Sequence, residues 1–205
     1  MSSHQGFKTL PTPCTLEQNG VRLEPLSLAH ETGLRLAAAD GELWRLRMTS
    51  VPEPENTAVY IQAALEGQKA GSMLPFAVID TQTSKVLGST RYHDVLPTLA
   101  RLEIGYTWYA QSHQRTHVNT VCKLMLLEHA FDHLGAAVVG WRTDHLNATS
   151  QRAIERLGAK LDGVLRHHAL RRDGSVRDSY MYSVIKSEWP QIHHRLLDQL
   201  KRHYP

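Results

Sequence analysis

Cysteine is scarce in this sequence, which has only Cys14 and Cys122 among its 205 residues. Two cysteines cannot build the disulfide framework of a small secreted domain, and they lack the paired spacing of a cysteine-ligated zinc site. Long apolar runs are missing as well, because no stretch approaches the roughly 20 residues that span a bilayer. Residues 1–10 also lack the basic and then apolar order of a secretory signal. We therefore expect a cytoplasmic protein with no membrane partner.

Strong charge of one sign is the next absence. The formal net charge is only +3, and the basic residues are scattered apart from Arg171, Arg172 and Arg177 around one turn. Proteins that bind nucleic acid usually carry a denser basic stripe together with aromatic platforms. The charge pattern therefore predicts no nucleic-acid partner.

Linkers, internal repeats and low-complexity tracts are absent too, so nothing divides the chain into several domains. Residues 1–20 contain Pro11, Pro13 and few periodic apolar residues, and we expect them to form a flexible N-terminal arm. Residues 21–187 then form one domain, and residues 188–205 form a C-terminal helical extension.

The sequence does contain a regular series of strand and helix patterns. Alternation of apolar and polar residues predicts strands at Val21–Leu26, Leu74–Asp80, Lys85–Tyr92, Arg101–Tyr109, Ala136–Thr143, Val164–Leu170 and Ser179–Ile185. Helical periodicity predicts helices at Ser27–Ala39, Thr57–Ala70, Val118–Leu134, Ala148–Leu157 and about 188–202. Ser27, Asn56 and Asn147 are the expected N-caps, and Gly158 lies in the favoured position just after a helix. The order predicts an α/β domain with a mixed sheet.

The junction of strand 101–109, loop 110–117 and helix 118–134 is the most informative part of the chain. Alternation predicts one strand face made of Leu102, Ile104, Tyr106 and Trp108. The helix start leaves several backbone N–H groups unpaired and aligned, and such a terminus attracts phosphate. The alternative is an ordinary strand-to-helix connection.

A family resemblance bears on this junction. The element order, together with Gln114-Arg115-Thr116-His117-Val118-Asn119-Thr120 after the strand, resembles the GNAT superfamily of acetyltransferases. The resemblance covers about residues 20–188 and looks closest to the branch that acetylates the N-termini of ribosomal proteins. It implies a GNAT-like α/β fold, with a mixed, mostly antiparallel central sheet that is flanked by helices and splays beside strand 101–109.

The resemblance also implies acetyl-CoA as co-substrate and a set of residues that bind it. In the family, a loop of the form Gln/Arg-x-x-Gly-x-Gly/Ala holds the CoA pyrophosphate with its backbone amides. Gln114 matches the first position, whereas His117 and Asn119 stand where the glycines are expected. The implied binding residues are Gln114, Arg115, Thr116, His117, Val118, Asn119 and Thr120. Asn147 matches the family's asparagine that reaches the pantetheine arm, although N-cap duty alone would also explain it.

Two residues are candidates for proton transfer. Glu103 lies in mid-strand, where an isolated carboxylate is uncommon without a task or a partner. It is the expected base, acting through water on the amine; the alternative is a salt bridge to Arg101 or Arg91. Ile154 stands where many family members have a tyrosine that acts as general acid to the thiolate. The resemblance therefore leaves Ser150 for this role. The alternative for Ser150 is a solvent-facing serine in the first helical turn.

The thirteen histidines raise the question of a metal site. His113 and His117 are four residues apart, as are His129 and His133. Two histidines at this spacing on one helix can bind zinc, but a site needs a third ligand and usually a nearby carboxylate. We predict no metal.

The predicted function is therefore acetyl-CoA-dependent N-acetyl transfer to a primary amine, either a protein N-terminal α-amine or a small molecule. Neither cysteine occupies a motif position, so we expect direct transfer in a ternary complex. A non-catalytic acyl-CoA-binding sensor is the main alternative, suggested by His117, Asn119 and the missing tyrosine. Acetylation of an antibiotic or a polyamine is a third possibility. A homodimer is also possible.

Overall fold

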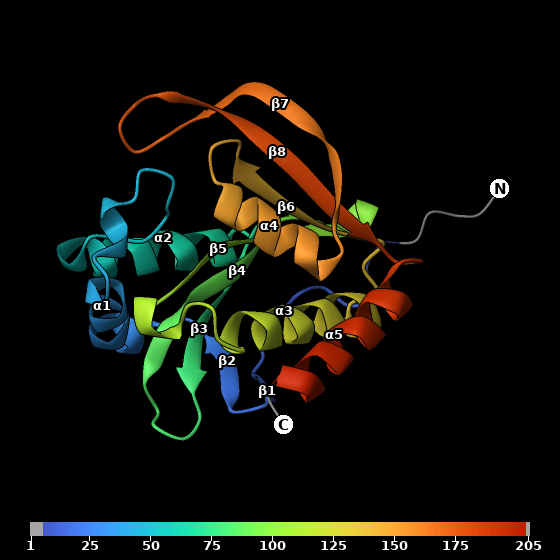
Figure 1. The fold of residues 1–205 in the computed structure, drawn as a ribbon, viewed down its shortest axis with the longest axis horizontal. Helices are drawn as coiled ribbons and strands as arrows, with labels where there is room; N and C mark the ends of the chain where they lie inside the picture. The colour runs from blue at the N-terminus through green and yellow to red at the C-terminus, as the bar shows by residue number, and fades with distance from the viewer. Residues whose placement is uncertain (1–5, 204–205) are drawn as a thin grey trace.

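An eight-stranded sheet organises the chain in the computed structural model, which describes residues 6–203 (Figure 1). The strand order is β1-β2-β3-β4-β5-β6-β8-β7. The pair β5–β6 is parallel and the other neighbouring pairs are antiparallel. The prediction of a mixed, mostly antiparallel sheet flanked by helices is therefore confirmed.

The strands lie on the predicted segments, but β7 begins four residues and β8 three residues before the predicted starts at Val164 and Ser179. They are β1 Leu16–Gln18, β2 Val21–Pro25, β3 Leu74–Asp80, β4 Val86–Leu96, β5 Arg101–Tyr109, β6 Val138–Asp144, β7 Lys160–Leu170 and β8 Val176–Ile185. β4 runs four residues beyond its expected end at Tyr92, and β6 ends at Asp144. β1 pairs with β2, so the prediction of a flexible arm is wrong for residues 16–18. Residues 1–5 lie outside the described residues.

The helices also lie where the periodicity places them. They are α1 Glu31–Ala39, α2 Thr57–Lys69, α3 Val118–Glu128, α4 Ala148–Leu157 and α5 Trp189–His203. α4 has the predicted bounds, and Gly158 closes it in the left-handed conformation at φ 95°. Asn56 does not cap α2 with its side chain, which instead donates to Glu53. The last predicted turn of α3 is a π-helix, His129–His133.

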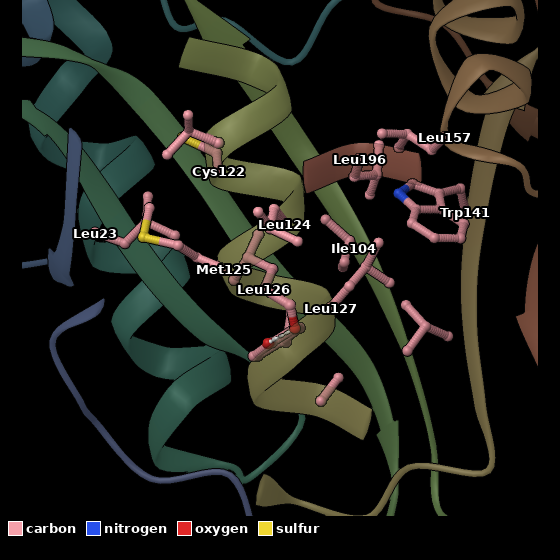
Figure 2. Packing of buried hydrophobic residues seen from close by; sticks show 14 of the residues in the cluster. Leu23, Ile104, Cys122, Leu124, Met125, Leu126, Leu127, Trp141, Leu157 and Leu196 are labelled. Carbon is pink, nitrogen blue, oxygen red and sulfur yellow. Dashed lines mark hydrogen bonds between the residues drawn. The ribbon is translucent and has the colours of Figure 1, made fainter. Parts of the chain in front are cut away.

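Two hydrophobic clusters cover the two faces of the sheet. α1 and α2 pack on one face, around Leu34, Ile61 and Trp108. α3, α4 and α5 pack on the other face, where Leu124 and Leu127 point toward Ile104 of β5 (Figure 2). The predicted inner face of α5, made of Trp189, Ile192, Leu196 and Leu200, is buried in this second cluster. The C-terminal helix is thus part of the same core as the sheet. None of the helices within residues 6–203 is long and apolar enough to cross a membrane.

β5 contains a bulge that reverses its side-chain alternation. Tyr106 has a left-handed backbone with φ 51°, and the pairing with β4 shifts between Arg91 and Ser89. Leu102 and Ile104 therefore face α3, whereas Trp108 packs on the opposite face with α1 and α2. The prediction that Leu102, Ile104, Tyr106 and Trp108 share one face is wrong, because a bulge changes the parity of the residues that follow it.

The parallel pairing of β5 with β6 is short. Arg101, Leu102 and Glu103 pair with residues 138–140, and the described residues show no β5–β6 pairing after Glu103 and Gly140. Both strands nevertheless continue, to Tyr109 and Asp144. The expected splay beside strand 101–109 is therefore present. We call this opening between β5 and β6 the V, and the paired residues Glu103 and Gly140 its apex.

A buried lysine gives the fold a testable pH dependence. Lys123 of α3 is 5% exposed and donates a 2.7 Å hydrogen bond to the hydroxyl of Thr107. Burial lowers the pKa of Lys123 from 10.5 to about 8. The unfolded chain therefore binds more protons than the folded protein between these two values, and the contribution of Lys123 to stability rises with pH across that window. Below about pH 8 the folded protein carries the full cost of a buried ammonium.

Replacing Lys123 by methionine should therefore stabilise the protein at pH 7, by roughly 3 kcal/mol at most. This gain should shrink as pH rises through 8 toward 10.5, where the unfolded lysine also loses its proton. Urea unfolding of both proteins at several pH values measures the difference. Burial also raises the pKa of Cys122 to about 12, so the contribution of this thiol to stability falls as pH rises above 9. Both proteins contain Cys122, and its effect therefore largely cancels when their stabilities are compared. An unchanged or reduced stability at pH 7 would contradict the buried, costly ammonium.

Candidate active site

Glu103 lies at the apex of the V and is 4% exposed. Its Oε2 accepts a 2.7 Å hydrogen bond from Nε of Arg142, which comes from the other arm of the V. The alternative of a salt bridge is therefore realised, but the expected partner is wrong. The sequence pointed to Arg101 or Arg91, whereas the cation comes from β6 because the parallel register places this strand beside Glu103.

His93 and Asp94, at the end of β4, complete the charged group at the apex. His93 pairs with Glu103 in the antiparallel register, and its Nε2 lies 4.0 Å from the Oε2 of Glu103. Its Nδ1 lies 2.8 Å from Oδ2 of Asp94. Arg142 also ion-pairs with Asp94. We call His93, Asp94, Glu103 and Arg142 the apex cluster.

Burial and the neighbouring charges together shift the pKa values of His93 and Arg142. Burial lowers the pKa of the His93 imidazole, and the nearby charges of Glu103 and Asp94 only partly oppose this effect. Burial also disfavours the charged form of Arg142, but the hydrogen bond and charge of Glu103 outweigh it and raise the pKa of Arg142. At neutral pH His93 is therefore a neutral imidazole and Arg142 a guanidinium cation.

The same residues resemble a metal-binding set in geometry alone. Ligand atoms of His93, Asp94 and Glu103 lie within 4.8 Å of one another. The guanidinium of Arg142, however, already ion-pairs with both carboxylates and supplies the positive charge that a metal ion would bring. A cation site here would first have to displace Arg142.

Aromatic side chains lead from the apex cluster to the surface. The ring of Tyr106 meets His93 edge-on, with centroids 5.2 Å apart. The guanidinium of Arg91 lies between the rings of Tyr106 and Tyr60, at 4.5 and 4.3 Å from their centroids. Tyr60 in turn lines a hollow of about 270 Å³ together with Arg172 and the segment 49–53. The hollow and the apex cluster are thus joined by a continuous stack.

The turn between β7 and β8 forms one wall of this hollow. Arg172 donates hydrogen bonds of 2.9 and 2.8 Å to the carbonyl oxygens of Trp44 and Val51, between α1 and α2. Arg171 forms a bidentate ion pair with Asp144 at the end of β6. Figure 1 shows the hairpin arching over the sheet toward the segment between α1 and α2. The hairpin therefore ties that segment to one arm of the V.

The loop after β5 is held in shape by hydrogen bonds. Ser112 donates to the carboxylate of Asp40 through its backbone N–H at 3.1 Å and its hydroxyl at 2.5 Å. The amide of Gln114 donates to the carbonyl oxygen of Tyr109 at 3.2 Å. Arg115 adopts a left-handed backbone with φ 60°. The side chain of Gln114, the residue that matches the family motif, thus fixes the loop to the end of β5.

α3 begins directly after this loop, with His117 at its N-cap position. The backbone N–H groups of the first helical turn, Val118 to Thr120, have no acceptor within the helix, and the dipole gives this end partial positive charge. The expected cofactor residues from Gln114 to Thr120 therefore form one continuous loop and helix start. A phosphate group fits that arrangement.

Asn147 and Ser150 follow the other arm of the V. The side-chain oxygen of Asn147 accepts a 3.0 Å hydrogen bond from the backbone N–H of Ser150, so the predicted N-cap is confirmed. Ile154, which stands in place of the family's tyrosine, is buried in the core. Glu103 thus lies on β5 at the apex of the V, whereas Ser150 lies in α4, which follows β6.

The sequence reading missed three members of the apex cluster, His93, Asp94 and Arg142. The predicted strand ended at Tyr92, so His93 and Asp94 were not placed beside Glu103. The sequence gives no alternation that extends the strand, because the polar pair His93 and Asp94 is followed by the apolar pair Val95 and Leu96. No local signal identifies Arg142, because its position depends on the register between β5 and β6.

The two cysteines and the histidines that the sequence pairs at helical spacing are not members of the apex cluster. Burial raises the pKa of Cys122 to about 12, and it also raises the pKa of Cys14. The Sγ of Cys14 lies 3.7 Å from Nε2 of His129, whose pKa burial lowers to about 4. His113 belongs to a short 3-10 helix and His117 to the start of α3, so these two do not share a helix face.

Comparisons with known proteins agree with this architecture. The sequence model of the family described as acetyltransferase (GNAT) domain matches residues 21–160. The uncharacterized N-acetyltransferase YoaA of Bacillus subtilis (strain 168) is 26% identical over 124 residues, which are 60% of this chain and 68% of that protein.

Solved structures show the same likeness. The crystal structure of a GCN5-related N-acetyltransferase from Brucella melitensis is 28% identical, with a TM-score of 0.84 over 98% of this chain and 90% of that chain. Mycobacterium smegmatis RimJ in complex with CoA-disulfide is 22% identical, with a TM-score of 0.75 over 95% of this chain and 97% of that chain. At this identity the likeness to RimJ shows the fold alone. Together these likenesses confirm the predicted GNAT-like fold.

Proposed function

Because the chain belongs to the GNAT acetyltransferase family and is an N-acetyltransferase, we propose that it moves the acetyl group of acetyl-CoA directly to a primary amine in a ternary complex. One observation carries this proposal. The V opens between β5 and β6 with the apex cluster at its closed end and the start of α3 beside its open end. A thioester and an amine can therefore meet beside groups that carry protons.

The residues that line the V fit acetyl-CoA, which supplies an activated acetyl group as a thioester. The pyrophosphate is assigned to the backbone N–H groups from Arg115 to Thr120, with the guanidinium of Arg115 adding a charge-assisted contact. The pantetheine arm is assigned to the main chain of β5 beyond Glu103, which β6 leaves unpaired, and to Asn147.

The reaction requires two proton movements. The amine nitrogen attacks the thioester carbon, a C–N bond forms, the C–S bond breaks, and the electron pair leaves with sulfur. Glu103 draws the ammonium to the apex and favours loss of its proton. Ser150 gives a proton to the departing thiolate and regains one, through water, from the nitrogen, which loses its second proton as the amide forms. Direct attack fits the surroundings of both cysteines, since burial raises the pKa of each thiol and disfavours a nucleophilic thiolate.

A protein N-terminus is the acceptor that this arrangement favours. With reference pKa values of ~10.4 for lysine and ~7.8 for an α-amine, deprotonation at pH 7 costs ~4.6 and ~1.1 kcal/mol respectively. Deprotonation with the help of Glu103 and His93 therefore has a smaller cost to overcome when the acceptor is an α-amine. The resemblance to the ribosomal-protein branch supports the same acceptor, and the hollow that Tyr60 lines offers its entry.

Binding of acetyl-CoA should raise the melting temperature, because a ligand at a hundredfold excess over Kd adds ~2.7 kcal/mol of stability. Arg115→Glu should reduce this shift by placing a carboxylate beside the pyrophosphate. Lys160→Glu, which changes the charge of a 75% exposed lysine in β7, is the matched control and should keep the full shift. The absence of any shift at millimolar acetyl-CoA would contradict the assigned cofactor site.

A panel of amines separates transfer from sensing. The panel contains peptides with a free N-terminus, peptides with only a free lysine, a polyamine and an aminoglycoside, and release of free CoA is measured for each. We expect amine-dependent release, fastest for the peptides with a free N-terminus. A protein that binds acetyl-CoA but releases CoA with none of the amines would be the non-catalytic sensor that His117 and Asn119 suggest.

A further inference from the structure

We propose that His93 receives the proton of the attacking amine, that Asp94 holds its imidazole in the required orientation, and that Glu103 stabilises the imidazolium that forms. This inference rests on the proposed function and names the proton acceptor of that reaction. It gives Glu103 an electrostatic task in place of the direct one that its position on β5 suggested.

The hydrogen bonds of His93 determine which nitrogen can act as a base. An ionised carboxylate only accepts, so the 2.8 Å contact with Asp94 requires the proton of the neutral ring on Nδ1. Nε2 then carries the lone pair. Its nearest carboxylate oxygen, on Glu103, lies 4.0 Å away, beyond hydrogen-bond distance. The lone pair is therefore not engaged by that carboxylate.

The position of Nε2 places this lone pair at the V. Gly105 is the second residue of β5 beyond the apex, and a Cβ built on it would lie only 2.3 Å from Nε2 of His93. The imidazole thus rests directly on the backbone of β5, in space that a side chain at position 105 would occupy. The bulge at Tyr106 follows immediately. His93 consequently approaches the strand that we assign to the pantetheine arm from the face opposite α3.

The charges around His93 suit a transient imidazolium. Asp94 contributes a carboxylate from its own strand, Glu103 a second from β5, and Arg142 the opposing guanidinium from β6. The ring also meets Tyr106 edge-on. Two carboxylates against one guanidinium leave a net negative charge, which favours both entry of an ammonium and protonation of the ring. The proton moves from the amine to Nε2, directly or through one water, and later returns to solvent.

Glu103 is less suited to take the proton itself. Its Oε2 already accepts a 2.7 Å hydrogen bond from Nε of Arg142, so this oxygen is engaged in the ion pair. His93 is neutral at pH 7, because burial lowers its pKa below the ordinary value. For a histidine with the reference pKa of ~6.5, transfer from an α-amine would be unfavourable by about twentyfold and from lysine by about 8000-fold; the lowered pKa of His93 increases both ratios and leaves the α-amine the easier donor.

The test is the dependence of kcat on pH from about pH 6 to about pH 9 for three variants, at saturating acetyl-CoA. His93→Gln should lower kcat at pH 7 by about 10²- to 10⁴-fold, and kcat should then rise by up to about tenfold per pH unit, as solution deprotonates the amine, until pH reaches the amine's pKa of ~7.8. Glu103→Gln should be slower than the wild type but should keep a level profile above neutral pH. His194→Gln, which changes an 81% exposed histidine on α5, should match the wild type.

Asp94→Asn supplies a second measurement that does not remove the imidazole. Asp94 has a left-handed backbone with φ 46°, which asparagine tolerates well. This variant should lower kcat by about tenfold and move the acidic limb of the profile to lower pH, because His93 loses a carboxylate partner. All variants should keep the wild-type melting shift with acetyl-CoA, which shows that they are folded and bind the cofactor.

Three results would count against the proposal. A His93→Gln profile parallel to the wild type would show that the ring carries no proton in the reaction. A tenfold rise per pH unit in Glu103→Gln, with a level profile in His93→Gln, would make Glu103 the base. Loss of the acetyl-CoA shift in His93→Gln would assign the residue to folding or binding. A wild type without turnover on any amine would instead overturn the proposed function itself.

Discussion

Replacing Glu103 by glutamine is expected to lower kcat by roughly 10²-fold while leaving acetyl-CoA affinity unchanged. The variant removes one of the two carboxylates that face His93, so the imidazolium and the incoming ammonium both lose a stabilising charge. Arg142 keeps its ion pair with Asp94 and is 28% exposed, so its charge is not stranded in the core. Steady-state kinetics with the best amine of the panel measures the loss.

Two further variants separate this effect from a structural one. Glu188→Gln removes the charge of another ion-paired glutamate, far along the chain, and should leave kcat unchanged. Glu103→Gln combined with Arg142→Gln removes both charges of the apex pair. If Glu103 served only to balance Arg142, the double variant would regain activity. We expect it to stay as slow as Glu103→Gln, and full recovery would argue that Glu103 has only a structural role.

Gly88→Ala is expected to destabilise the protein by at least about 3 kcal/mol, at the upper end for a single substitution. A Cβ on Gly88 would lie 2.0 Å from the carbonyl oxygen of Trp108 and 2.9 Å from the Cα of Tyr109. Both clashing atoms belong to the backbone of β5, so no side-chain rotation relieves them. β4 and β5 must then separate next to the bulge and the start of the cofactor loop. The measurement is the free energy of unfolding in urea.

Gly163→Ala is the matched control for this prediction. Gly163 also lies in a strand, β7, but nothing comes within 4 Å of a Cβ built there. Its substitution should change the free energy of unfolding by no more than about 0.5 kcal/mol. Equal effects of the two alanines would mean that β4 and β5 do not approach as closely at Gly88 as the structure shows.

Most of the fold could be predicted because its signals are local. Strand alternation and helical periodicity depend on neighbouring residues, and β3, β5 and α4 begin and end where those patterns place them. Gly158 closes α4 because a glycine adopts φ 95° at little cost. β1 was missed because three residues are too few to show a period.

The departures have non-local causes. The bulge at Tyr106 reverses a perfect alternation, and only the shifted register with β4 reveals it. The π-helix after α3 arises beside a long-range contact, since the hydroxyl of Tyr92 donates to the carbonyl oxygen of Leu126 and lies 3.2 Å from Nδ1 of His129. Tertiary contacts of this kind do not appear in the periodicity of one segment.

The residues of the candidate site likewise fall into those with a local sequence signal and those placed by long-range strand pairing. Gln114 to Thr120 could be identified from a motif and a helix start, and Asn147 from a cap. Glu103 could be identified as an unusual mid-strand carboxylate, but its partners could not. His93 comes from an adjacent strand and Arg142 from a parallel one, so the apex cluster exists only once the register of β4, β5 and β6 is known.

The central claim is direct transfer between two substrates that meet in the V. Its most direct test is the initial rate of CoA release, measured against peptide concentration at several fixed concentrations of acetyl-CoA. Direct transfer predicts reciprocal plots that intersect, because both substrates must be bound before any product leaves. Parallel lines, together with an acetylated protein isolated in the absence of amine, would show a covalent intermediate and contradict the account.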